Sequence, residues 1–272
     1  MKKACIILAS LLALTVFTNC SHSGAFNKNG SVEPDISSGD HLTMAVLYQQ
    51  TAAEYRALCY QTFNLARMQL DQNLKRMGLM RQQAIVVDID ETVLDNSPYE
   101  AKCILDAIQY PAYWDEWVEL AKAEPVPGAL EFLQYAESKG IEVYYITNRR
   151  EKHREATLMN LKKIGFPYAE HDFLLMRTDE AGKKSRRDKV AETRQIIMLI
   201  GDNLNDFSEI FEEQLISERF ALTDSLKTEF GTRFIVLPNA MYGDWEGAVL
   251  NYDHSKSPTE KEMMRHKALK GF

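Results

Sequence analysis

This chain of 272 residues has few cysteines and histidines, and its 32 lysines and arginines are outnumbered by 39 aspartates and glutamates. None of its four cysteines forms a Cys-x-x-Cys pair, which excludes a zinc knuckle and a thioredoxin-like motif. The six histidines show no paired metal spacing and no Arg-His-Gly sequence, so we assign none of them to catalysis. The formal net charge of −7 argues against binding to a nucleic-acid polymer, because such binding needs a dominant basic surface. No repeat of fixed period is visible, which excludes a solenoid or a propeller.

The first residues differ in character from the rest of the chain. Two lysines precede an apolar run that ends at Phe17, and a short polar stretch follows. This order is typical of a secretory signal peptide, and the apolar run is short for crossing a bilayer. We therefore expect this segment to be removed from the mature protein.

The polar stretch ends in Cys20 and resembles the end of a bacterial lipoprotein signal, in which that cysteine becomes the lipidated first residue. We expect a signal peptide in residues 1–19 and a lipidated tether in residues 20–39. The chain would then belong to the bacterial cell envelope, held by its lipid at the outer membrane or the periplasmic face. Plain secretion is the alternative, because Phe17 and Asn19 depart from the usual lipobox pattern.

The remaining chain alternates between segments suited to strands and segments suited to helices. With 45% apolar residues it can bury a sizeable core, as one large domain or two small ones. Short apolar runs rich in β-branched residues suit buried parallel strands. These runs are Ala84–Asp90, Ile141–Ile146, Phe173–Met176, Ile196–Ile200 and Phe234–Leu237. The alternation predicts an α/β fold, a parallel sheet with helices on both faces, whose ligands sit beyond the carboxyl ends of the strands.

Three further segments are expected to surround this sheet. Residues 40–80 have helical composition and predict one amphipathic helix or two in sequence. The sheet and its helices would span residues 81–250, with a polar and aromatic insertion at about 97–127. Residues 251–272 predict a C-terminal helix with Pro258 at its first position. Together the first segment, the insertion and the C-terminus predict a smaller helical subdomain.

Polar groups suited to phosphate or metal chemistry follow four successive predicted strands. Singly, each is common, because acidic pairs, Thr-Asn turns and lysine runs occur in many proteins. In chain order the four groups are Asp88-Ile89-Asp90-Glu91-Thr92, Thr147-Asn148-Arg149, Lys183-Lys184-Ser185-Arg186-Arg187 and Gly201-Asp202-Asn203-Leu204-Asn205-Asp206. As an ordered set they are specific.

This ordered set resembles the haloacid dehalogenase superfamily of phosphohydrolases, with its Asp-x-Asp-x-Thr, Thr or Ser, Lys and Gly-Asp-x-x-x-Asp motifs. More narrowly, residues 88–99, 147–149 and 201–207 look like those of class C bacterial acid phosphatases, secreted lipoproteins with four motif aspartates. The resemblance extends from about Asp40 to Gly247. It implies a Rossmann-like sheet and hydrolysis of small-molecule phosphomonoesters.

Asp88 and Asp90 can take separate roles in such a reaction. Alternate residues of a strand project to the same side, roughly 7 Å apart. Asp88 is the expected nucleophile on phosphorus, which gives an aspartyl-phosphate intermediate. Asp90 would protonate the leaving-group oxygen and later deprotonate the attacking water.

A cation is expected in this site, because the nucleophile and the phosphate are both anionic and repel each other in a low-dielectric cleft. Oxygen ligands without histidine or cysteine favour Mg²⁺. The resemblance implies that the Asp88 carboxylate, the Asp90 backbone carbonyl and Asp202 bind the ion. It implies that Asp206 contacts metal-bound water or orients the site.

Phosphate oxygens would receive hydrogen bonds from the Thr147 hydroxyl and the Asn148 backbone N–H. One lysine would neutralise charge between the nucleophile and the phosphate. Lys183 and Lys184 are adjacent, and we prefer Lys184 because its spacing to Arg187 matches the Lys-x-x-Arg pattern of the family.

Aromatic residues of the insertion and of the segment after the last strand are mostly expected to be core anchors. For Trp114 and Tyr242 the resemblance implies two rings that sandwich an aromatic leaving group, such as a nucleobase. Stacking tolerates many bases, so 5′-nucleotides and aryl phosphates would both be substrates. Cys59 and Cys103 are the candidates for a disulfide, if cleavage and lipidation account for the other two cysteines.

Two other classes of protein compete with the enzyme. A signalling receiver module also forms an aspartyl phosphate, but a second carboxylate two residues after the nucleophile supplies acid/base chemistry, and an exported chain would lack a cytosolic kinase partner. A non-catalytic surface lipoprotein that binds phospho-ligands would be expected to have lost a motif aspartate, and all four are present. The sequence leaves room for a homodimer.

Overall fold

The computed structural model describes residues 39–76 and 82–272. The expected signal peptide and all of the expected tether except Gly39 lie outside the described residues, and so does Cys20. Within the described ranges, no helix has both the length and the hydropathy needed to cross a bilayer.

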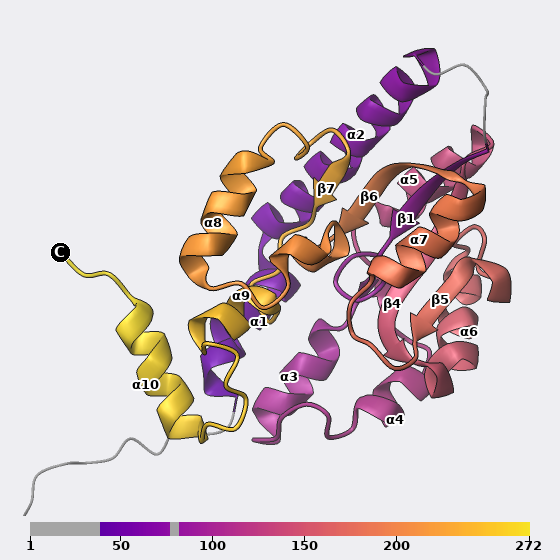
Figure 1. Cartoon of the computed structure of the whole chain (residues 1–272). Helices are drawn as coiled ribbons and strands as arrows, with labels where there is room; N and C mark the ends of the chain where they lie inside the picture. Colours follow the sequence, from indigo (N-terminus) through magenta and orange to yellow (C-terminus); the bar gives the residue numbers. More distant parts are fainter. Residues whose placement is uncertain (1–38, 77–81) are drawn as a thin grey trace, which may run out of the picture. The chain divides into compact units, whose positions relative to one another are not determined.

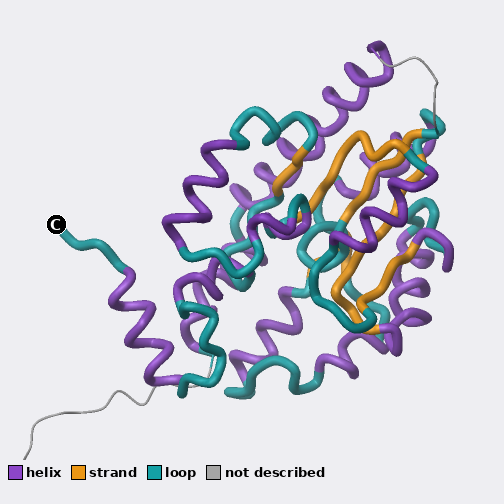
Figure 2. Tube along the Cα trace, in the orientation of Figure 1, coloured by secondary structure: helices purple, strands orange, loops and turns teal. Residues whose placement is uncertain are grey.

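A five-stranded parallel sheet forms the centre of the described chain, in the order β5-β4-β1-β6-β7 (Figures 1 and 2). Its strands are β1 (Gln83–Val87), β4 (Glu142–Arg150), β5 (Leu174–Arg177), β6 (Gln195–Gly201) and β7 (Phe234–Val236). All five coincide with predicted strands, and the predicted α/β fold is confirmed.

Two strand ends differ from the prediction, and both differences affect the site. β1 ends at Val87, so Asp88 and Asp90 belong to the loop that follows the strand. β4 continues past Ile146 to Arg150, which pairs with β5 across a register shift. Thr147 and its neighbours therefore belong to β4 itself. The apolar pattern alone predicts this strand too short.

Helices cover both faces of the sheet, because successive strand residues point to opposite sides. Ile85 and Val87 of β1 belong to one core cluster, whereas Ala84 and Val86 belong to another. The first cluster includes buried residues of the helices α2 (Ala53–Arg76), α5 (Ala129–Ser138) and α6 (Arg154–Ile164). The second includes Val190 of α7 (Lys184–Thr193). The two-sided burial accounts for the nearly continuous apolar sequence of β1.

The segment before β1 forms two helices in sequence. The short 3₁₀ helix η1 (Asp40–Leu42) leads into α1 (Thr43–Thr51), and α2 follows. The two α-helices are separated at Ala52, whose backbone is extended with ψ of 123°. Cys59 in α2 is buried as a free thiol, and so is Cys103 in the insertion.

The insertion leaves and re-enters the fold through a pair of short antiparallel strands, β2 (Leu94–Asp95) and β3 (Glu124–Pro125). Between them lie α3 (Ser97–Leu105) and α4 (Trp114–Glu119), and α3 also contacts α1 and η1. The two-stranded frame places the aromatic residues of the insertion near the carboxyl end of β1.

The remaining elements complete the second half of the chain. They are η2 (Glu151–His153), η3 (His171–Phe173), η4 (Leu204–Asp206), η5 (Glu209–Phe211), α8 (Ile216–Ser225), α9 (Asp244–Val249) and α10 (Pro258–Ala268). Ser257 caps α10: its hydroxyl accepts from the Glu260 N–H, and the Glu260 carboxylate accepts from the Ser257 N–H in return. Arg265 of α10 donates to Glu246 of α9 at 2.8 Å, which joins the last two helices.

Candidate active site

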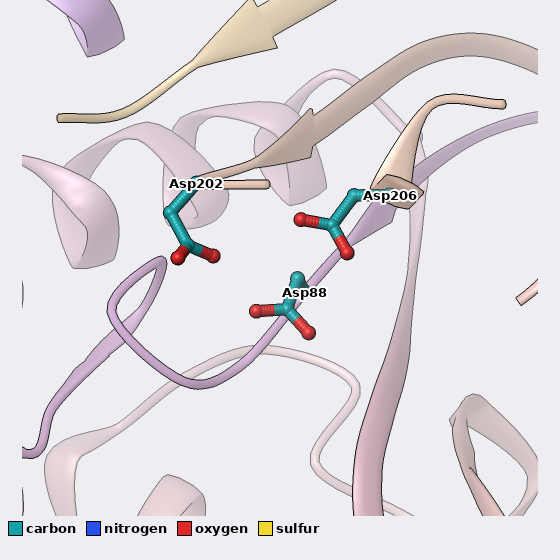
Figure 3. Close-up of side chains that lie close together, drawn as sticks. All are labelled: Asp88, Asp202 and Asp206. Carbon is teal, nitrogen blue, oxygen red and sulfur yellow. The ribbon is translucent and has the colours of Figure 1, made fainter. Parts of the chain in front are cut away.

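Three carboxylates meet at the carboxyl end of the sheet. Asp88 follows β1, Asp202 follows β6, and Asp206 ends the η4 turn. One carboxylate oxygen of each lies within 4.8 Å of the other two, and Figure 3 shows the three side chains pointing toward one another. Adjacent strands of a parallel sheet end at the same edge, which is why residues more than a hundred positions apart converge here.

Gly201 makes the close approach of Asp206 possible. A Cβ atom built on Gly201 would clash with the Asp206 side chain. Asp206 is further held because its carboxylate accepts the Asn203 N–H at 3.0 Å in a capping box around η4. The glycine of the fourth motif therefore has a packing reason, in addition to forming a turn.

Lys183 is the cation inside this carboxylate cluster. Its side chain is buried, and its Nζ donates to Asp88 and, at 2.6 Å, to Asp206. Lys184, the lysine preferred from the sequence, lies exposed on α7 and pairs with Asp188 at 2.5 Å. The prediction that Lys184 lies beside the nucleophile is therefore wrong, because Lys183 occupies that position. The Lys-x-x-Arg spacing could not decide, because Lys183 and Arg186 satisfy it as well.

The cluster carries more negative than positive charge. Burial, together with the repulsion of Asp206, raises the pKa of Asp202 to about 7, and burial raises the pKa of Asp88 well above its ordinary value. Burial alone would lower the pKa of Lys183, but the attraction of Asp206 and Asp88 outweighs it and raises that pKa. Three carboxylates outnumber one ammonium, so negative charge is in excess. A divalent cation that binds oxygen ligands would neutralise this excess.

Asp90 lies beside this cluster with different partners. Its Oδ1 accepts from the Arg149 Nε at 2.9 Å and from the Asn96 amide at 2.8 Å, and its Oδ2 accepts from the Thr147 hydroxyl at 3.2 Å. The Asp90 side chain is thus turned toward β4 and the insertion, while Asp88 faces Asp202 and Asp206. The two carboxylates are therefore held by different partners.

The two β4 residues predicted to bind phosphate lie at the same edge. Thr147 is buried and Asn148 is exposed. Arg186 of α7 donates to the Thr147 carbonyl at 2.5 Å and to the Asn148 side-chain oxygen at 2.8 Å. The loop that carries Lys183 is also held, because Arg186 donates to the Gly182 carbonyl at 3.0 Å. Arg186 therefore links the second and third motifs.

A cavity of about 680 Å³ opens in front of these groups. All four motif aspartates, Asn148 and Lys183 line it, together with Trp114 and Tyr242. The Trp114 ring packs edge-on against Tyr99 and Tyr110, with ring centroids 5.0 and 5.9 Å away, and the Arg149 guanidinium lies 5.6 Å from its centroid. The Tyr242 hydroxyl donates to the fully buried Glu91. Both rings are thus fixed by other side chains at the wall of the cavity that contains the aspartates.

Several residues of the site were not singled out by the sequence argument. Asn96 donates to Asp90 and Glu91 and accepts from the Trp117 Nε1 at 2.8 Å, so it connects the first motif to the insertion. Arg149 lies in the polar end of β4 and is 3% exposed, and a buried charge needs an acidic partner, which is the signal that could have indicated its contact with Asp90. The Thr92 hydroxyl lies 3.2 Å from both Asp88 and Asp202.

Comparison with known proteins agrees with this geometry. The family described as HAD superfamily, subfamily IIIB (Acid phosphatase) matches residues 19–245. The chain belongs to this family. The resemblance inferred from the four motifs is thereby confirmed, and the site lies where the motifs of this acid phosphatase family converge.

Solved structures and curated relatives include acid phosphatases and a protein that is named for storage. The class C acid phosphatase from Bacillus anthracis, also solved with tungstate bound, is 43% identical with a TM-score of 0.84, and the match covers 87% of this chain and 100% of that one. Acid phosphatase 1 from Solanum lycopersicum is 27% identical over 151 residues, or 52% of this chain and 57% of the relative. Vegetative storage protein 1 from Arabidopsis thaliana is 30% identical over 132 residues, or 46% and 48%. The chain thus spans about half the length of these curated relatives.

The two neighbouring lysines give a matched test of the placement. Replacing Lys183 with methionine should lower the free energy of unfolding by about 3 kcal/mol or more, because it removes one partner of a buried charge network. Replacing the exposed Lys184 with methionine should change it far less, because its ion pair with Asp188 is screened by solvent. Urea denaturation of both variants in chelator-treated buffer measures the difference. Equal losses would contradict the assignment of Lys183 to the cluster.

Proposed function

We propose that this protein is a Mg²⁺-dependent acid phosphatase that hydrolyses phosphomonoesters through an aspartyl phosphate on Asp88. The observation that carries the proposal is the convergence of Asp88, Asp202, Asp206 and Lys183 at one wall of a cavity that also contains Asp90. Membership of the acid phosphatase family supports the same conclusion. A non-catalytic phospho-ligand-binding lipoprotein is less well supported, because it would not need the separately held Asp90.

In the first step an Asp88 carboxylate oxygen attacks phosphorus, and the bond between phosphorus and the ester oxygen breaks. The leaving alcohol takes its proton from the Asp90 carboxyl. The contacts of Asp90 support this role, because Arg149, Asn96 and Thr147 hold its side chain without pairing it to Lys183. In the second step water attacks the phosphoryl group, Asp90 takes the proton of that water, and phosphate leaves with Asp88 restored.

Charge neutralisation falls to Lys183 and to donors from β4. The Lys183 ammonium already contacts the nucleophile, so it can offset the negative charge of an incoming phosphate. The Thr147 hydroxyl and the Asn148 backbone N–H are the proposed donors to phosphate oxygens. In this role Thr147 would exchange its hydrogen bond to Asp90 for one to the substrate.

Mg²⁺ fits the donor set, which contains buried or partly buried oxygen atoms and no nitrogen or sulfur ligand. Asp88 and Asp202 would hold the ion with their carboxylates and Asp90 with its backbone carbonyl, while Asp206 would contact metal-bound water or orient the site. When bound, the ion would supply positive charge that reduces the repulsion between Asp88 and the phosphate. Asn239 supports Asp202 in this arrangement, because its side-chain amide donates to that carboxylate at 2.8 Å.

Nucleoside monophosphates and aryl phosphates are the proposed substrates. Trp114 and Tyr242 line the cavity beside the aspartates, and flat rings there suit an aromatic leaving group. We further propose that the mature protein is anchored through a lipid on Cys20 in the bacterial cell envelope, at the outer membrane or the periplasmic face, and that it associates as a homodimer. The lipoprotein-like end of the signal sequence at Cys20 supports the anchor and the envelope location.

Metal removal tests the cation. Purified mature protein should hydrolyse p-nitrophenyl phosphate and 5′-nucleotides in the presence of Mg²⁺, and EDTA should abolish the reaction, because two anions would then meet in a buried site. Adding back excess Mg²⁺ should restore the rate measured by phosphate release. Full activity after exhaustive chelation would contradict a metal-dependent mechanism.

The nucleophile is tested by Asp88→Asn, which should reduce kcat by roughly a thousandfold or more because no carboxylate oxygen remains to attack phosphorus. The melting temperature should stay nearly unchanged or rise, since the substitution removes a charge that burial and the repulsion of Asp206 and Asp202 disfavour, which offsets the lost attraction of Lys183. Asp188→Asn is the matched control, because Asp188 is an exposed aspartate of α7 outside the site. An Asp88→Asn variant as active as the control would rule out this nucleophile.

A further inference from the structure

The cavity extends well beyond the groups that the hydrolysis uses. Besides the motif residues, parts of η1, α3, α9 and α10 line it. At about 680 Å³ it has the size of a pocket for a whole small molecule, which is far more than a phosphate group needs. Its outer part would therefore surround the leaving group of the phosphomonoester.

Glu100 of α3 is the unusual side chain in this outer part. It is only 8% exposed, and it lines the cavity. Among residues 39–76 and 82–272, no hydrogen bond or ion pair satisfies its carboxylate. A buried carboxylate without a partner costs free energy that most folded proteins avoid.

Neighbouring acidic groups are satisfied, which makes the contrast clear. The buried carboxylate of Glu91 accepts from the Asn96 backbone N–H at 2.7 Å, from the Asn96 amide at 3.2 Å and from the Tyr242 hydroxyl. Glu246 accepts from Arg265 at 2.8 Å. Glu100 therefore differs from Glu91 and Glu246 in that its carboxylate accepts no hydrogen bond from the described residues.

The surrounding charges do not supply a partner for Glu100. Arg265 is engaged by Glu246 and Glu262, and His41 lies 3.6 Å from Glu246. Burial, and secondarily the repulsion of Glu246, raises the pKa of Glu100 to about 7. The ionised form of Glu100 would therefore gain strongly from a donor brought in by a ligand.

We propose that Glu100 determines leaving-group specificity by accepting a hydrogen bond from a hydroxyl or ammonium group on the substrate. The proposal rests on the proposed phosphatase function and adds a specificity residue to it. Trp114 and Tyr242 would hold the ring of the leaving group, and Glu100 would select rings that carry a donor. Glu100 takes no part in bond breaking, which remains with Asp88 and Asp90.

Matched pairs of substrates test this selection. The quantity measured is the kcat/KM of the substrate that carries the donor divided by the kcat/KM of the substrate that lacks it. Tyramine phosphate and para-ethylphenyl phosphate differ in an ammonium group, and adenosine 5′-monophosphate and its dideoxy analogue differ in the ribose hydroxyls. The wild-type enzyme should prefer the donor-bearing member of at least one pair by about tenfold, the effect of one hydrogen bond to a charged group. That pair identifies the kind of donor.

Glu100→Leu should abolish the preference, chiefly by raising KM for the donor-bearing substrate. Glu100→Gln keeps an acceptor oxygen without the charge, so it should retain a hydroxyl preference and lose an ammonium preference. Glu116→Leu is the control, because Glu116 is exposed on the neighbouring helix α4. Glu100→Ala replaces the leucine variant if that variant does not fold.

The proposal is overturned if the wild-type enzyme prefers neither donor-bearing substrate. It is also overturned if the leucine or alanine variant of Glu100 keeps the kcat/KM ratio of each substrate pair within about threefold of the ratio measured for Glu116→Leu. Failure of the phosphatase function itself is distinguishable, since it would leave wild-type protein inactive on every substrate, including p-nitrophenyl phosphate. A fall of more than about threefold in the kcat/KM ratio of the pair that the wild-type enzyme discriminates supports Glu100 as the specificity residue.

Discussion

Mutual repulsion among buried carboxylates is the constraint on which this site depends. Asp88, Asp202 and Asp206 converge in a place where burial already disfavours their charged forms. Lys183 offsets part of that charge and leaves room for one further cation. A site with excess negative charge attracts a metal, and the loaded site can then receive an anionic phosphate. Binding of the substrate would therefore depend on the metal, because the excess negative charge attracts the cation and repels the phosphate.

Much of this arrangement is predictable from the sequence. Apolar runs of β-branched residues indicated the five parallel strands, and ligands of such sheets gather at the carboxyl ends. That rule alone brings together Asp88 after β1 and Asp202 after β6, because these strands are neighbours. The end of β4 was harder to predict, since Thr147 and Arg150 are polar residues that continue a strand beyond its apolar part. The hydrophobic pattern identifies the buried part of a strand. It does not detect the polar residues by which the strand continues into the site.

Side-chain direction is what the sequence could not supply. Lys183 and Lys184 are identical in type and adjacent, and only the start of α7 decides that the first points into the cluster and the second into solvent. Glu100 is a similar case, because a glutamate in a short helix is usually exposed, and only the packing of α3 on its neighbours buries it against the cavity. Arg149, by contrast, was detectable in principle, as a charged residue that directly follows the apolar part of a buried strand and its Thr-Asn pair.

The most direct test of the central claim is a crystal structure of the protein with Mg²⁺ and orthovanadate. The account predicts vanadium at bonding distance from a carboxylate oxygen of Asp88, with the metal held between Asp88 and Asp202 and the Lys183 ammonium on a vanadate oxygen. Vanadate bound in the cavity away from Asp88, or metal bound without these aspartates, would contradict it.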